Sequence, residues 1–151
     1  MSQTHAHKAE TSLTLDSRLS SLALVAPWLD ALASEHAFPA DLRFAIDLCL
    51  EEALSNVIRH GYRDQPNHAI ALSFTSDGKS SLSFVIEDNA PHFTPAEQEA
   101  PQPIHASIDT LQPGGQGIRL MRKFAGALAW QQLPNGNRLT ITFPAATPIL
   151  D

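Results

Sequence analysis

Apolar and polar residues alternate over residues 12–16, SLTLD, and this pattern predicts a short strand. Over residues 18–36 the apolar positions instead recur every three or four residues, which predicts an amphipathic helix. Asp16 or Ser17 can cap this helix. Pro27 should kink it, because proline removes a backbone hydrogen bond from a helix interior.

The second helical pattern begins at Pro39, carries Asp41 in its first turn and ends at Gly61. Two alternating segments follow, residues 69–75 and 82–88, and a short polar turn separates them. This arrangement predicts a β-hairpin. Two helices therefore precede any substantial sheet.

The segment 89–113 is unusually rich in proline and has no periodic pattern. Loops of this length inside a compact domain are usually lids or binding loops, so we expect a lid here. A third helix is predicted to start near Gly115. The segments 127–132 and 138–143 flank a Pro-Asn-Gly turn and form a closing hairpin. The element order predicts an α+β fold, a two-layer sandwich of a mixed, mostly antiparallel sheet with helices on one face.

Composition narrows the class of protein. The 151 residues fit one domain over residues 12–151, after a polar tail at residues 1–11 that we expect to be disordered. The net charge of -6 argues against direct nucleic-acid binding, which favours a dense basic surface. The single cysteine, Cys49, excludes an internal disulfide, and no apolar stretch is long enough to span a membrane. We therefore expect a cytoplasmic location and no membrane contact.

The basic residues are unevenly placed along the chain. Residues 114–150 contain four Lys or Arg and no Asp or Glu, although the chain as a whole is acidic. This acid-free stretch begins at a run of glycines, and its positive charge would favour an anion bound there.

Two polar residues of the second helix form the first candidate site. Glu52 and Asn56 lie one helical turn apart and adjoin the apolar stripe, so both are aimed at whatever this face covers. Glu51 points roughly 100° away and should be the more solvated acid. The simpler alternative is an ordinary helical acid that pairs with Arg59 or His60.

Asp88 forms the second candidate site, at the end of a predicted strand. It shares its face with the apolar residues Leu82, Phe84 and Ile86, so it should be directed toward the core. A buried carboxylate needs hydrogen-bond donors. Either a ligand amine or the amides of the following turn can supply them.

Three glycines, Gly114, Gly115 and Gly117, precede and open the third predicted helix. A helix start without bulky side chains leaves free N–H groups for a phosphate. The alternative is a flexible hinge, and the spacing matches neither the P-loop nor the dinucleotide fingerprint.

Taken together, these motifs resemble the ATP-binding domain of the GHKL superfamily, with its Bergerat-type fold. More narrowly, the segments EALSNVIRHGY, DNAPHFTP, GGQGIRLMRKF and NRLTITF resemble the RsbW-like anti-sigma-factor serine/threonine kinases. The resemblance implies that Glu52 is the general base, that Asn56 holds Mg²⁺ and that Asp88 accepts the adenine amine. It implies these nucleotide-binding residues: Asn56, Asp88, Ala90, Phe93, Gly114, Gly115, Gly117, Ile118 and Thr140.

The implied activity is phosphorylation, by ATP with Mg²⁺, of a serine or threonine on an anti-sigma-factor antagonist. The implied partners are this antagonist, a sigma factor and a second copy of the chain in a homodimer. One departure stands out, since the family has glycine where this chain has Ala90. The added methyl would crowd the adenine or strain a turn that needs positive φ. It favours the alternative function, a weak or inactive binding module that sequesters a partner.

Two further alternatives lack support in these residues. The catalytic domain of a histidine kinase would need dimerisation helices with an acceptor histidine, and a gyrase-like or chaperone-like clamp would need transducer domains.

Overall fold

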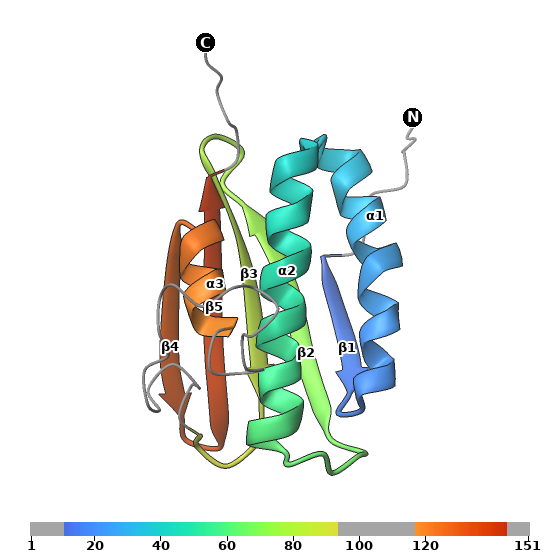
Figure 1. The fold of residues 1–151 in the computed structure, drawn as a ribbon, viewed down its shortest axis with the longest axis vertical. Helices are drawn as coiled ribbons and strands as arrows, with labels where there is room; N and C mark the ends of the chain where they lie inside the picture. The colour runs from blue at the N-terminus through green and yellow to red at the C-terminus, as the bar shows by residue number, and fades with distance from the viewer. Residues whose placement is uncertain (1–10, 94–116, 145–151) are drawn as a thin grey trace, which may run out of the picture.

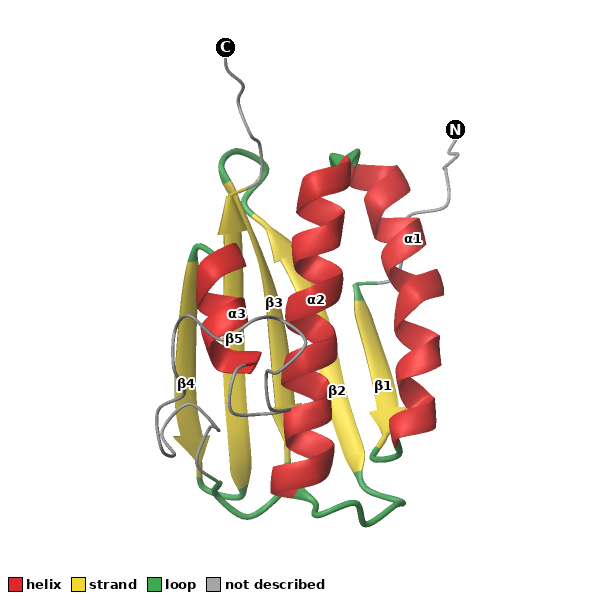
Figure 2. Cartoon of the chain, viewed as in Figure 1, coloured by secondary structure: helices red, strands yellow, loops and turns green. Residues whose placement is uncertain are grey.

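The computed structural model describes residues 11–93 and 117–144, which form one sheet with helices on a single face (Figures 1 and 2). The sheet is five-stranded, with the order β1-β2-β3-β5-β4, and every neighbouring pair is antiparallel. Its strands are β1 (Ser12–Asp16), β2 (Ala69–Ser76), β3 (Ser81–Asp88), β4 (Ala127–Leu133) and β5 (Gly136–Pro144). The predicted α+β class is confirmed, with an antiparallel sheet.

Three α-helices of the described residues cover the sheet. They are α1 (Val25–His36), α2 (Ala40–Asn56) and α3 (Gly117–Phe124). In Figures 1 and 2, α2 crosses the middle of the sheet, α1 lies beside it over β1, and α3 lies over β4 and β5. No helix in the described part of the chain is both long and apolar enough to cross a membrane.

The first predicted helix is divided in two. A 3-10 segment, η1 (Leu19–Leu24), precedes α1, and Pro27 falls in the first turn of α1. N–H groups of a first turn have no partner within the helix, so proline is tolerated there and the predicted mid-helix kink is wrong.

The predicted side-chain cap at Asp16 or Ser17 is also wrong, because no side chain caps the N-terminus of η1. The Ser17 hydroxyl instead donates to the Gln65 carbonyl at 2.6 Å and accepts from the His68 N–H at 3.2 Å. These bonds join the end of β1 to the loop before β2.

Helix α2 begins after Pro39, has Asp41 in its first turn, and continues into a π-helical segment, η2 (Val57–Gly61). The Tyr62 N–H donates to the Val57 carbonyl at 2.8 Å, five residues back. The helical path ends at Gly61, as the sequence predicts, but its last turn is wider than an α-turn.

The hydrophobic core fills the space between the helices and one face of the sheet. Strand β3 buries every second residue, and β5 does the same from Asn137 to Phe143. The largest fully buried side chains are Phe84, Phe143, Leu15, Leu29, Leu32, Ile46, Leu50, Leu54, Ile58, Ile70, Leu72 and Ile86. This alternation determines which polar side chains of β3 and β5 face α2.

Candidate active site

Helix α2 directs Asn56 into the interior beside the sheet. Asn56 is only 6% exposed, and its side chain makes no hydrogen bond within the described residues. Glu52 lies one turn earlier and is half-buried, whereas Glu51 is exposed. The predicted contrast between the two acids is confirmed.

Burial gives the Glu52 carboxyl group an unusual proton affinity. Desolvation raises its pKa above the ordinary value; Arg59 and His60 act in the lowering direction, and Glu51 acts in the raising direction. A carboxylate with a raised pKa is a better proton acceptor near neutral pH, which suits a general base. No ion pair links Glu52 to Arg59 or His60 in the part of the chain that the structure describes.

Asp88 ends β3 on its helix-facing side and is 4% exposed. Its Oδ1 accepts two hydrogen bonds, from Asn137 Nδ2 at 2.8 Å and from the Ala90 N–H at 2.9 Å. Burial raises the pKa of Asp88, while these two bonds and the nearby His92 act in the opposite direction. The amide of the following turn, which is the alternative to a ligand amine as donor, therefore does bond to Asp88. Both bonds reach Oδ1, and Oδ2 has no hydrogen-bond partner among the described residues.

A narrow cavity separates α2 from the ends of β3 and β5, and its volume is about 20 Å³. It is lined by Ala53, Asn56, Val57, Ile86, Asp88, Phe93, Trp130, Asn137, Arg138 and Leu139. Apolar walls with a few polar groups are typical of small-molecule sites. About one water fits in this volume, so a heterocyclic ring would have to displace the half-buried side chains of Phe93 and Trp130.

Ala90 does not crowd this cavity. It is 1% exposed and is absent from the cavity lining, and its φ lies outside the positive region. A Cβ added at Gly61 would lie 3.1 Å from the Ala90 Cβ, so the Ala90 methyl group faces the end of η2. The close approach of Gly61 accommodates the alanine, and the expected strain of a positive φ is absent.

Thr140 lies on the other face of the sheet. In β5 the buried residues alternate from Asn137, so Thr140 is opposite Val85, with its side chain away from the helices. The structure brings Asn137 to the cavity in place of Thr140. The register of β5 against Asp88 is the signal that could have identified Asn137, and it is a tertiary property.

The glycine-rich motif is only partly described. Gly117 is the first residue of α3, and Ile118 follows it in the first turn. Gly114, Gly115 and residues 94–113 of the predicted lid lie outside the described residues, as does the predicted tail up to residue 10.

The donor set of the cavity suits a hard cation better than zinc. No group of three or more His, Cys, Asp or Glu residues that could hold a metal occurs among the described residues. Asn56 is 6% exposed and lines the cavity, and its amide oxygen is the kind of ligand that Mg²⁺ takes together with phosphate oxygens and water.

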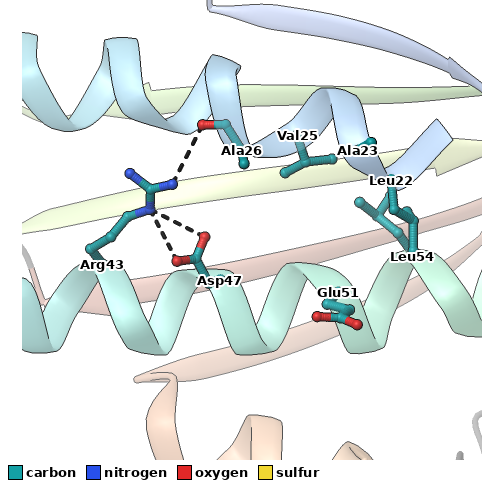
Figure 3. A pocket seen from close by; sticks show the side chains of 8 residues that line it. All are labelled: Leu22, Ala23, Val25, Ala26, Arg43, Asp47, Glu51 and Leu54. Atoms are coloured by element: carbon teal, nitrogen blue, oxygen red, sulfur yellow. Dashed lines mark hydrogen bonds and ion pairs between the residues drawn. The ribbon is translucent and has the colours of Figure 1, made fainter. Parts of the chain in front are cut away.

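A larger cavity, of about 420 Å³, lies on the other flank of α2, between it and the η1–α1 segment (Figure 3). Arg43 closes one side with ion pairs to Asp30 at 2.8 Å and Asp47 at 3.1 Å and a bond to the Ala26 carbonyl at 3.4 Å. This cavity includes Glu51 but neither Glu52 nor Asn56, so the two hollows lie on opposite sides of one helix.

Comparison with known proteins agrees with this geometry. The family described as "Histidine kinase-like ATPase domain" matches residues 15–143. The serine/threonine-protein kinase BtrW of Bordetella bronchiseptica is 38% identical over 120 residues, which cover 79% of this chain and 82% of that protein. An anti-sigma F factor of Geobacillus stearothermophilus is 32% identical over 87 residues, and this match spans about half of each chain, 52% and 53%.

Solved structures show the same fold at lower identity. The RsbU and RsbW domains of a Mycobacterium tuberculosis protein superpose with a TM-score of 0.57 at 16% identity, over 89% of this chain and 32% of that one. The histidine kinase domain of a blue-light activated kinase from Erythrobacter litoralis gives 0.51 at 17% identity, over 93% of this chain and 66% of that one. The chain therefore belongs to the family of histidine kinase-like ATPase domains, and within it is similar to the serine/threonine-protein kinase BtrW.

Proposed function

We propose that this chain is an ATP-dependent protein serine/threonine kinase that acts as an anti-sigma factor. The observation that carries the proposal is the arrangement of Asn56 on α2 and Asp88 on β3 around one cavity with apolar walls, with Glu52 one helical turn before Asn56. The kinase BtrW, which is similar over most of its length, supports the same class of reaction.

Each polar residue has a distinct role in this proposal. Asp88 accepts a hydrogen bond from the adenine amine through its free Oδ2. The Asn56 oxygen would hold Mg²⁺, which would neutralise charge on the phosphates. Glu52 accepts the proton of the incoming serine or threonine hydroxyl as its oxygen attacks the γ-phosphate of ATP, and ADP leaves.

The protein substrate in this proposal is an anti-sigma-factor antagonist, and a sigma factor is the alternative partner. The anti-sigma F factors among the relatives support this pairing. Because ATP and a sigma factor are both found in the cytoplasm, we propose that location. The alternative, sequestration without catalysis, loses its specific support because the Ala90 methyl group packs against Gly61.

Phosphotransfer from labelled ATP tests the proposal. The chain is incubated with γ-labelled ATP, Mg²⁺ and candidate antagonists from the same genome, and we expect label on a serine or threonine of one of them. Calorimetry with and without Mg²⁺ is run in parallel. Binding of ATP without transfer to any antagonist would contradict the kinase proposal, and absence of binding would leave only the sequestration role.

A further inference from the structure

Phe44 and Leu48 place apolar surface on the outward face of α2, one helical turn apart. Phe44 is 60% exposed, the highest value among the large hydrophobic side chains of the described residues, and Leu48 is half-buried. Single exposed apolar side chains are common on protein surfaces, so the surroundings of Phe44 determine whether it has a role.

Helix α3 extends this apolar surface from the side. It lies beside α2 (Figure 1), and the Phe124 ring meets the Phe44 ring edge-on, with 5.9 Å between centroids and 83° between planes. Phe124 is half-buried against the core, so its ring restricts the exposed ring of Phe44. A restricted apolar side chain loses less entropy when a partner covers it. We call Phe44, Leu48 and Phe124 the Phe44 ridge.

The ridge extends along α2 toward Glu52. Phe44, Leu48 and Glu52 occupy positions i, i+4 and i+8, so each lies next to the following one on the helix surface. With a rise of 1.5 Å per residue, Phe44 lies about 12 Å along the helix from Glu52, and Leu48 lies about 6 Å from it. A protein segment whose hydroxyl reaches Glu52 can therefore follow α2 and cover the ridge.

A positive charge borders the ridge. The Lys123 Nζ lies 6.0 Å from the centroid of the Phe124 ring, and the side chain is exposed. Lys123 forms no ion pair with any residue that the structure describes, and α3 contains no Asp or Glu. An acidic side chain of a partner would be attracted to this edge.

Nucleotide binding does not account for the ridge. None of its three residues lines the cavity of Asn56 and Asp88, which adjoins the C-terminal half of α2. Loss of the ridge should therefore leave ATP binding intact. The ridge adjoins only the acid that receives the proton of the substrate hydroxyl.

We propose that the Phe44 ridge docks the segment of the protein substrate that carries the acceptor serine or threonine, with Phe44 as a specificity-determining residue. The inference rests on the proposed kinase function and adds the surface that selects its protein substrate. An extended chain advances about 3.3 Å per residue, so an apolar side chain on Phe44 lies three to four residues from a hydroxyl at Glu52. An acidic residue next to this apolar side chain pairs with Lys123.

The test separates recognition of the protein substrate from chemistry and from ATP binding. Phe44→Ala removes the ring, and Phe44→Leu keeps an apolar side chain. The matched control is Leu24→Ala, because Leu24 is 53% exposed but lies on η1. Transfer of label from saturating ATP is measured against the concentration of the antagonist that the wild type labels. Calorimetry gives the dissociation constant for ATP, and thermal unfolding confirms that each variant is folded.

We expect Phe44→Ala to raise the KM for the antagonist about tenfold, while kcat and the dissociation constant for ATP change less than about twofold. Phe44→Leu should recover most of this loss, and Leu24→Ala should keep the wild-type KM. Lys123→Ala should raise KM about two- to threefold at low salt, and added salt should bring it back toward the wild-type value.

Three results would overturn the inference and leave the kinase function intact. They are an unchanged KM in Phe44→Ala, an equal rise in Leu24→Ala, and a loss confined to kcat or to ATP affinity. A wild-type protein that labels no antagonist would instead overturn the proposed function together with this inference.

Discussion

The Tyr62 hydroxyl accepts a hydrogen bond from the backbone N–H of Asn89 at 2.8 Å. The same hydroxyl donates to the carbonyl of Ala69, also at 2.8 Å. One side chain after η2 thereby joins the start of β2 to the turn that follows Asp88. The position of the candidate adenine-binding carboxylate thus depends on the end of α2 as well as on β3.

Removal of this hydroxyl should loosen the turn. Tyr62→Phe leaves a backbone N–H and a carbonyl without their partner, so we expect a loss of about 1–3 kcal/mol in the free energy of unfolding. Hydrogen exchange of the Asn89 amide should accelerate in the variant, because its acceptor is gone. Urea unfolding and amide exchange measure the two effects. Unchanged protection of this amide would contradict the role given to Tyr62.

The contact between Gly61 and Ala90 predicts a coupled pair of substitutions. Gly61→Ala should destabilise the fold by about 1–3 kcal/mol, because its new Cβ would lie 3.1 Å from the Ala90 Cβ and 3.1 Å from the Phe93 ring. Ala90→Gly should cost about 1–2 kcal/mol through the lost methyl group and added chain entropy.

The double variant should be less destabilised than the sum of the two, by about 0.5 kcal/mol or more, because the second change makes room for the first. Chemical denaturation of the four proteins provides the cycle. Strict additivity would mean that the two positions do not share this space.

Glu52→Gln should retain ATP binding and lower the rate of phosphotransfer by about 10²–10⁴-fold, because the amide cannot accept the proton. Glu51→Gln is the matched control, since Glu51 is the neighbouring acid and is exposed on the other flank of α2. Calorimetry measures binding, and transfer of label from ATP measures the rate. Full activity of the Glu52 variant would exclude the general-base role.

Asp88→Asn should stabilise the protein without nucleotide and abolish adenine recognition. Burial raises the pKa of Asp88 above 3.8, so the folded state binds its proton more tightly than the unfolded state does. The stability that this protonation contributes is fully present below about pH 3.8, the ordinary pKa of the unfolded state. It is lost as the pH rises through the pKa of Asp88 in the folded state.

The variant has no such proton, so its advantage in unfolding free energy should be largest near neutral pH and shrink on acidification. Thermal unfolding from pH 7 to pH 4 measures this dependence. A variant that is less stable than the wild type at pH 7 would contradict it. Nucleotide affinity of the wild type should fall on acidification through the same raised pKa, because the neutral carboxyl group is a weaker acceptor.

Trp130 should report nucleotide binding by fluorescence. It is half-buried in the cavity wall, whereas the other tryptophan, Trp28, is 7% exposed and packs edge-on against Phe84 at 6.0 Å. Addition of ATP should change the emission of the wild type and leave that of Trp130→Phe nearly unchanged. A change that persists in the variant would place the nucleotide elsewhere.

The periodic elements could be predicted from the sequence, because alternation and helical spacing are local properties. The inward direction of Asp88 followed from its parity with Phe84 and Ile86, and it is confirmed. The spacing of a helix likewise predicts that Glu52 and Asn56 lie one turn apart on the same face of α2.

What the sequence left out depends on tertiary contacts. The bonds of Ser17 to the loop before β2 arise between distant segments. Asn137 was missed because its role depends on the pairing of β3 with β5. Thr140 was predicted to bind the nucleotide because its segment resembles the family's last strand. Strand alternation places its side chain on the face of the sheet that points away from the helices.

The wide turn at the end of α2 makes the site sensitive to insertions and deletions. An α-helix rotates by about 100° per residue, so a turn that closes over five residues shifts the angular phase of everything after it. Deletion of one residue within Val57–Gly61 would restore a regular helix and rotate Tyr62 away from Asn89. In a homologous chain, the spacing between the Glu52–Asn56 pair and the tyrosine should therefore be more constrained than the lengths of the surface loops.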